Sequence, residues 1–173
     1  VWLIMKEKTL RYEALVRALH GDIYRYAYWL TNDKSTAEDI VQETFLRAWR
    51  ALDSLQDEKA AKSWLITILR RENARRFERK QFDLVDFDEV SVAGNEDQDS
   101  DAEVRQVRRA IGKLAPDYRE PLMLQIIFGF SGDEIAQQLE LNKNTVMTRL
   151  FRARAQLKDA LTSSSQQRGF HSG

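Results

Sequence analysis

Apolar residues recur at three- and four-residue steps through most of the chain, the spacing that places side chains on one face of an α-helix. In the first half this pattern predicts three helices, over residues 12–30, over 37–52 and from about residue 63 onward. Residues 35–38 (STAE) have the form of a capping box, which predicts the start of the second helix. The polar residues 53–62 predict a loop before the third helix.

The helical pattern stops between residues 82 and 103, where low hydrophobicity and high charge predict an unfolded linker. It then resumes and predicts four further helices, over residues 104–114, 118–129, 131–139 and 144–161. Ser131 and Glu134 have the spacing of a second capping box. Residues 162–173 are expected to form a frayed, flexible tail.

The composition favours an all-α fold, because the 173 residues include only two prolines and seven glycines. The pattern predicts two small helical domains, residues 12–81 and 104–161, joined by the acidic flexible linker 82–103. Residues 1–11 are expected to form an N-terminal extension. The apolar residues at its start are too few for a signal peptide.

The net charge of zero, from 27 basic and 27 acidic side chains, hides an uneven distribution. Residues 1–81 carry a net charge of +4, residues 82–103 of −9 and residues 104–173 of +5. Basic domains favour polyanions such as nucleic acids, whereas an acidic segment avoids them. The distribution therefore predicts two nucleic-acid-binding domains on a tether that stays off the nucleic acid.

The residue types present argue against several kinds of site. The chain has no cysteine and only two histidines, which disfavours disulfides, thiol catalysis and a metal centre. Asp39 and Glu43 lie one helical turn apart, but no histidine, cysteine or glycine-rich loop completes a catalytic site. No apolar run approaches the length of a membrane span, about 20 residues. We therefore expect a cytoplasmic protein that is not an enzyme, needs no cofactor or metal and is not inserted in a membrane.

Residues 134–153 predict two short helices joined by a tight connection, the arrangement of a helix-turn-helix. Ala136 is small enough to let the two helix axes approach closely. The second helix carries five basic residues and no acidic one between residues 143 and 158, which favours DNA binding. The alternative is an ordinary helical hairpin with a solvated basic face. The expected contacts to duplex DNA are Lys143, Asn144, Thr145, Thr148, Arg149, Arg152 and Arg154.

A second candidate surface lies on the predicted helix 37–52, on the side opposite its core-facing residues. Six side chains fall within a sector of about 120° there, and two of them are large and apolar. This combination is typical of a protein-binding patch with an aromatic anchor and a polar rim. The alternative is that another helix of the same domain covers Leu46 and Trp49. The members of this patch are Asp39, Gln42, Glu43, Leu46, Trp49 and Arg50.

Basic residues crowd the second half of the third predicted helix, with six between residues 69 and 80 against two acidic ones. They occupy most of the helix circumference, so we expect this half to follow a phosphate backbone, with Phe77 free for packing or stacking. The alternative is a solvated helix end whose charges stabilise the helix dipole. The candidate nucleic-acid contacts are Trp64, Arg70, Arg71, Asn73, Arg75, Arg76, Arg79 and Lys80.

Taken in order, these motifs resemble those of the extracytoplasmic-function (ECF) sigma factors, which retain only the second and fourth conserved sigma regions. The resemblance covers about residues 12–161, nearly the whole chain. The segments that carry it are residues 37–49 (AEDIVQETFLRAW), 63–65 (SWL), 134–136 (EIA), 144–146 (NTV) and 149–154 (RLFRAR).

The resemblance implies a role for each candidate surface. The patch on helix 37–52 would bind core RNA polymerase, against a helical element of its largest subunits. The third helix would read and melt the minus-ten promoter element, and the loop 53–62 beside Trp64 would hold a flipped base. The helix-turn-helix would read the minus-thirty-five element in duplex DNA. The resemblance also implies control by an anti-sigma factor, usually in response to stress or another signal.

The sequence departs from the family pattern at several positions. Arg71, Arg75 and Glu78 replace an Asn, an Asp and an Arg, so the family's minus-ten preference does not carry over. Glu140 and Asn144 stand where glycine is common, and a left-handed backbone would strain Glu140 mildly. The alternative function is a stand-alone helix-turn-helix transcriptional regulator, which would need neither the polymerase patch nor the basic third helix.

Overall fold

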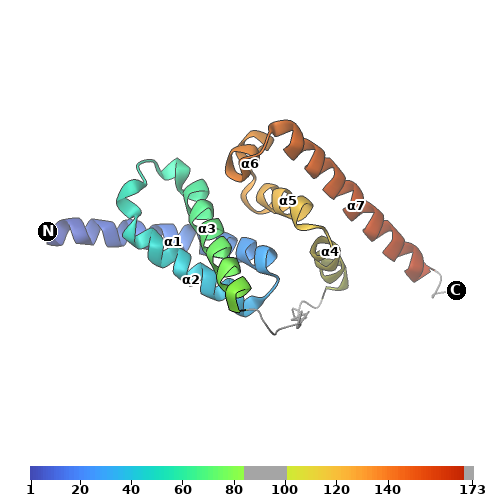
Figure 1. Ribbon diagram of the computed structural model, residues 1–173, viewed down its shortest axis with the longest axis horizontal. Helices are drawn as coiled ribbons and strands as arrows, with labels where there is room; N and C mark the ends of the chain where they lie inside the picture. The colour runs from blue at the N-terminus through green and yellow to red at the C-terminus, as the bar shows by residue number, and fades with distance from the viewer. Residues whose placement is uncertain (84–100, 170–173) are drawn as a thin grey trace. The chain divides into compact units, whose positions relative to one another are not determined.

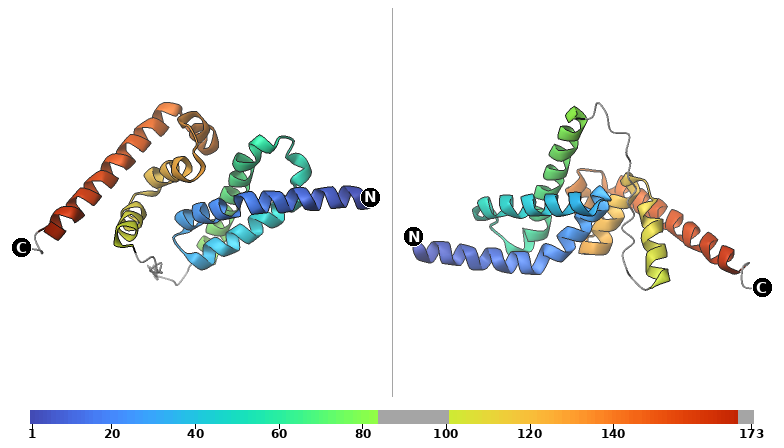
Figure 2. Two further views of the ribbon diagram at one scale, coloured as in Figure 1. Left: turned by 180° about the vertical axis from the view of Figure 1, so that it is seen from behind. Right: turned by 90° about the horizontal axis from the view of Figure 1, so that it is seen from below.

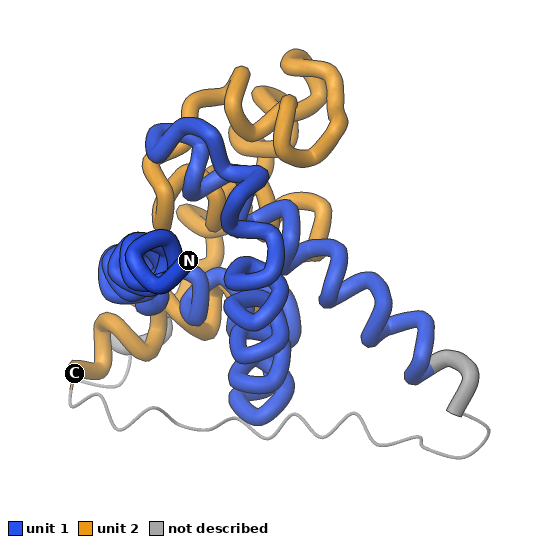
Figure 3. The backbone as a smooth tube through the Cα atoms, turned by 90° about the vertical axis from the view of Figure 1, so that its left-hand side faces the viewer, with its two compact units in different colours: residues 1–93 blue, residues 94–173 orange. Residues whose placement is uncertain are grey.

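The computed structural model describes residues 1–83 and 101–169. Within these ranges the chain is helical and forms no strand, which confirms the all-α prediction. The chain divides into two compact units, residues 1–93 and 94–173 (Figure 3). Most of the predicted linker 82–103 lies outside the described residues.

The described residues of unit 1 form three α-helices, α1 (Trp2–Thr31), α2 (Lys34–Arg50) and α3 (Ala61–Asp83). Helices α1 and α2 run side by side, and α3 packs against both (Figures 1 and 2). The buried apolar residues of α2 therefore have neighbours on both sides. The main core side chains are Leu15, Leu19, Ile23, Tyr26 and Ala27 of α1, Ala37, Ile40, Val41, Phe45 and Ala48 of α2, and Leu65, Ile66 and Leu69 of α3.

Helix α1 begins at Trp2, well before the predicted start at residue 12. The expected N-terminal extension is thus helical, which agrees with the absence of glycine and proline among residues 1–20. Its first turn is exposed to solvent, since Trp2, Leu3 and Ile4 are all largely exposed.

The turn between α1 and α2 corrects the predicted capping box. Asn32 adopts the left-handed conformation with φ 52° and donates its N–H to the Tyr28 carbonyl. Asp33 is then the N-cap of α2, because its carboxylate accepts the Thr36 amide N–H at 3.1 Å. The box predicted at residues 35–38 is wrong, since Asp33 already occupies the cap and both Ser35 and Thr36 lie inside the helix.

The predicted loop 53–62 contains two short 3₁₀ turns, η1 (Leu52–Ser54) and η2 (Glu58–Ala60), and α3 begins at Ala61. Leu52 and Leu55 are buried, so the segment is fastened to the core although most of its side chains are exposed.

Residues 101–169 of unit 2, the part that the structure describes, form four helices, α4 (Ala102–Gly112), α5 (Pro116–Phe128), α6 (Gly132–Leu139) and α7 (Lys143–Gly169). Helix α7 packs against the other three (Figure 1). Gly129 ends α5 with φ 68°, a conformation that suits glycine. The capping box of Ser131 and Glu134 is confirmed. The main core side chains are Ile111, Leu114, Leu122, Met123, Leu124, Phe128, Phe130, Ile135, Val146, Leu150 and Ala153.

Two further expectations concern the helix-turn-helix connection and the C-terminal end of α7. Glu140 has φ 55°, so the strain expected at this position is present. Helix α7 continues to Gly169, and the frayed tail predicted from residue 162 is therefore wrong as far as the described residues extend. No glycine or proline interrupts residues 143–168, so nothing in the backbone stops the helix earlier.

Replacing Asp33 by Ala should lower the free energy of unfolding of unit 1 by about 1 kcal/mol at neutral pH, because an N-cap acceptor is lost. The hydrogen bonds from the Thr36 hydroxyl and amide hold the pKa of Asp33 below its usual value. Its contribution is therefore complete above the unfolded-state pKa, about 3.9, and is lost as the pH falls through the lower folded-state pKa.

Urea unfolding followed by tryptophan fluorescence measures this effect, since all four tryptophans lie in unit 1. The matched control is Ser35→Ala, which should leave stability unchanged. A loss of stability in Ser35→Ala equal to that in Asp33→Ala would instead support the capping box predicted at residues 35–38, with Ser35 as the N-cap.

Candidate protein and nucleic-acid interfaces

The outer face of α2 carries the predicted protein-binding patch. Leu46, a large apolar side chain in the middle of the helix, is 52% exposed. Asp39, Gln42 and Arg50 surround it and are also exposed, whereas Glu43 is half-buried. The alternative that another helix covers Leu46 is therefore wrong for this residue.

Trp49 is different, because α1 covers it in part. Tyr12 packs edge-on against the indole with ring centroids 5.2 Å apart, and the Lys8 Nζ lies 4.5 Å from the ring centroid. The Tyr12 hydroxyl donates to the Phe45 carbonyl at 2.9 Å, and burial raises the pKa of this phenol. Trp49 is thus held at the edge of the patch in a fixed orientation, with part of its surface exposed.

A buried carboxylate lies between α2 and α3. Glu72 is 7% exposed and forms ion pairs with the Arg47 guanidinium of α2 and, at 2.7 Å, with Arg75 Nη1. Arg47 Nε also lies 3.2 Å from Glu43 Oε1. This four-residue network was not predicted, although an acidic residue within a strongly basic helix was a signal for it.

The basic half of α3 is only partly available to a ligand. Arg75 is paired with Glu72, and Arg76 Nη1 lies 3.4 Å from Asp39 Oδ2, within the α2 patch. Both arginines are half-buried, as are Trp64, Arg70 and Asn73. The most exposed members of the predicted set are Arg71, Arg79 and Lys80, and Phe77 beside them is 64% exposed.

In unit 2, α6 and α7 form the predicted helix pair, with Ile135, Val146 and Leu150 buried between helices. An open hollow of about 610 Å³ lies beside the first turns of α7. Five of the seven predicted contacts line it, namely Asn144, Thr145, Thr148, Arg149 and Arg152. The start of α5 lines its other side with Ala115, Asp117 and Tyr118, a contribution that the sequence did not indicate.

The remaining two predicted contacts lie outside the hollow. Lys143 Nζ pairs with Asp133 at 3.3 Å, and the Arg154 guanidinium contacts the Gln125 side chain of α5. Met147 and Phe151 were not among the predicted contacts either. They are 48% and 74% exposed, one turn apart, on the same helix as the arginines.

Comparison with known proteins identifies both units. Residues 15–82 match the family model of Sigma-70 region 2, and residues 104–157 match that of Sigma-70, region 4. Together the two matches cover more than half of the chain. They place the patch of α2 and the basic half of α3 in region 2, and the helix-turn-helix in region 4.

Individual relatives agree with these matches. The chain is 30% identical over 164 residues to the ECF RNA polymerase sigma factor SigE of Mycolicibacterium smegmatis, covering 90% of this chain and 63% of that protein. It is 32% identical over 148 residues to the ECF sigma factor SigL of Mycobacterium tuberculosis, covering 79% of this chain and 83% of that protein.

A solved structure gives the same result. The sigma factor RpoE of Bartonella quintana, in complex with the anti-sigma factor NepR, superposes with a TM-score of 0.65 at 28% identity, covering 94% of this chain and 98% of that one. The chain therefore belongs to the ECF family of RNA polymerase sigma factors.

Among the described residues, 1–83 and 101–169, none of the helices has the length and apolar character needed to span a membrane.

Replacing Glu72 by Gln should lower the free energy of unfolding of unit 1 by about 2 kcal/mol. Removing one partner of a fully buried ion pair costs about 3 to 5 kcal/mol, and the partial exposure of both arginines reduces this cost. Tryptophan-monitored urea unfolding measures the change. Glu78→Gln, an exposed site on the same helix, is the matched control and should be neutral. Equal stability of the two variants would contradict a structural role for Glu72.

Proposed function

We propose that this protein is a promoter-specific transcription initiation factor that binds core RNA polymerase and directs it to a defined set of promoters. The observation that supports this most strongly is the presence of both sigma regions in one chain, each with a candidate surface of suitable chemistry. The family consists of initiation factors and not of enzymes, so the surfaces are expected to bind and open DNA without chemical catalysis. The cytoplasm is the expected compartment, because core polymerase and promoter DNA are there.

Core polymerase would bind the α2 patch. Leu46 supplies exposed apolar area, Trp49 is an aromatic anchor with a fixed orientation, and Asp39, Gln42 and Arg50 form the polar rim. Binding energy in such patches is concentrated in a few central apolar and aromatic residues. A helical element of the polymerase would match the length of this face.

Promoter DNA would contact both units. The hollow beside α7 is lined by Arg149 and Arg152, which suit phosphates and base edges of a duplex. The exposed cations of α3 suit the backbone of an opened strand. Opening costs about 1.4 kcal/mol per base-pair step, and stacking a captured base on an aromatic side chain returns about 1 to 3 kcal/mol. A few captured bases therefore offset local melting without ATP.

Control by an anti-sigma factor is part of the proposal. The related RpoE of Bartonella quintana was solved in complex with the anti-sigma factor NepR, at a similarity that spans 94% of this chain. An inhibitor that covers Leu46 would block the polymerase patch directly. The competing function, a stand-alone helix-turn-helix regulator, does not account for the region 2 match or for an exposed Leu46.

Transcription with purified core polymerase on a library of genomic fragments tests the proposal. The expected result is a small set of transcripts that depend on this protein and start at shared sequence elements. Co-elution with core polymerase on a sizing column is the second readout. The proposal fails if no transcript depends on the protein and the two do not co-elute.

Replacing Leu46 by Ala should weaken binding to core polymerase about tenfold, since it truncates the apolar centre of the patch. Because Leu46 is 52% exposed, the stability of unit 1 should change little. Leu10→Ala, which truncates a leucine of similar exposure on α1, is the matched control and should bind normally. Competition of labelled and unlabelled protein for core measures both affinities. Equal affinities would place the interface elsewhere.

Replacing Arg152 by Ala should weaken binding to minus-thirty-five duplex and reduce the slope of log affinity against log salt by about 1, as expected for the loss of one phosphate contact. Lys158→Ala removes a charge from the same helix outside the hollow, and its slope should stay close to that of the wild type. Fluorescence anisotropy at several salt concentrations measures both slopes. Identical slopes for wild type and Arg152→Ala would mean that the phosphates lie on another face.

A further inference from the structure

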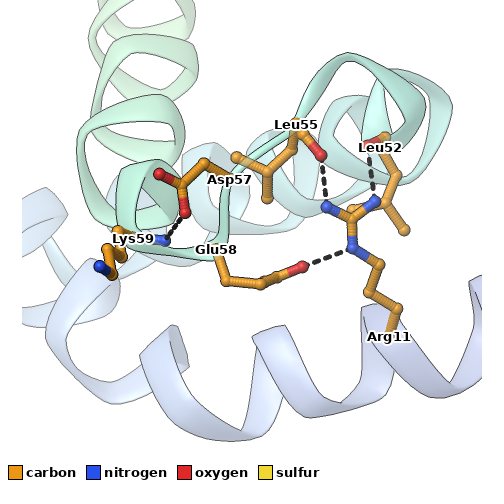
Figure 4. A network of polar contacts seen from close by, with 6 residues as sticks. All are labelled: Arg11, Leu52, Leu55, Asp57, Glu58 and Lys59. Atoms are coloured by element: carbon orange, nitrogen blue, oxygen red, sulfur yellow. Dashed lines mark hydrogen bonds and ion pairs between the residues drawn. The ribbon is translucent and has the colours of Figure 1, made fainter.

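The second and third turns of α1 contact the segment between α2 and α3. These turns lie before residue 15, where the match to region 2 begins. Arg11 points from α1 at this segment (Figure 4). Its Nε lies 2.6 Å from Glu58 Oε1, its Nη1 donates to the Leu52 carbonyl at 3.3 Å, and its Nη2 donates to the Leu55 carbonyl. The Arg11 side chain thus contacts three residues of the segment, Leu52, Leu55 and Glu58.

The two carbonyls belong to the first 3₁₀ turn and to the residue that ends it. The Leu52 carbonyl also accepts the Leu55 N–H at 3.1 Å within the turn, and the planar guanidinium can donate to both carbonyls at once. A lysine ammonium is a single point of charge and cannot reproduce this fork. An arginine at this position can therefore contact both carbonyls of the segment together, whereas a lysine cannot.

The opposite side of the segment is fastened to α3. Trp64 Nε1 donates to the Ser54 hydroxyl at 3.3 Å, and Leu52 and Leu55 are buried below. Between these anchors, Asp53 and Gln56 are exposed and able to contact a ligand. The segment is thus a surface loop with exposed polar side chains whose backbone is fixed from two helices.

We propose that Arg11 is a positioning residue that holds residues 52–60 in the shape that receives an unpaired base of the opened minus-ten element. The inference rests on the proposed function, since it requires promoter opening. A loop that is already ordered loses less conformational entropy when a base binds, so more of the stacking energy remains to offset melting. Arg11 touches no base itself and acts through the backbone of this loop.

The test compares three variants of the full chain assembled with core polymerase. Arg11→Gln removes the fork, and Arg11→Lys keeps only the charge. Glu58→Gln is the matched control, because it removes the ion pair with an exposed carboxylate and leaves both carbonyl contacts in place. Exposed ion pairs contribute little, so this control should behave like the wild type.

The probe is a single-stranded oligonucleotide that carries the minus-ten sequence of a promoter found by the transcription assay. Arg11→Gln should bind it about tenfold more weakly, as for the loss of one stacked base, and should lower transcription to a similar degree. Arg11→Lys should recover only part of this loss. Amide hydrogen exchange of residues 52–60 should rise in Arg11→Gln, while that of α2 stays unchanged.

Two results would overturn the inference. One is wild-type oligonucleotide affinity and transcription in Arg11→Gln. The other is a parallel loss of core binding and of unit 1 stability, which would make Arg11 a folding residue only. If the wild-type protein itself directs no transcription, the proposed function fails and the inference with it. If the wild type is active and Arg11→Gln equals it, only the inference fails.

Discussion

The packing of unit 1 depends on the burial of one face of α2. Ala37, Thr44 and Ala48 are completely inaccessible because α1 and α3 pack against this face. Because an α-helix has 3.6 residues per turn, a helix that is covered on one face points the side chains of its opposite face away from the core. Leu46 is exposed for this reason, since its neighbour Phe45 already fills the core side. The outward direction of Leu46 in the candidate polymerase patch is thus fixed by the packing of the domain.

The same packing limits how much of the basic charge is available to nucleic acid. Counting charges along the second half of α3 predicts basic residues over most of its circumference, but Glu72 is buried and pairs with Arg47 and Arg75, so part of this charge is internal to the fold. Arg76 is similarly shared with Asp39 of the patch. The exposed cations that remain are Arg71, Arg79 and Lys80, so the candidate DNA surface of α3 is narrower than the sequence indicates.

Local patterns predicted the helices and their exposed faces, because periodicity reports which side of a helix is covered. They failed where the outcome depends on geometry or distance. The choice of Asp33 over Ser35 as the cap of α2 depends on how Asn32 turns the chain, and the pattern does not contain that information. The contact between Arg11 and Glu58 joins residues 47 positions apart, which no local pattern can indicate.

The first turns of α1 contact both the α2 patch and the loop between α2 and α3. Lys8 and Tyr12 hold the indole of Trp49, while Arg11, within the same two turns, holds the loop between α2 and α3. These side chains come from one helix, so a shift of its first turns would move the aromatic anchor and the loop together. A displacement of these turns on binding of polymerase at Trp49 would therefore also move the loop that is proposed to capture a base, because Arg11 contacts that loop.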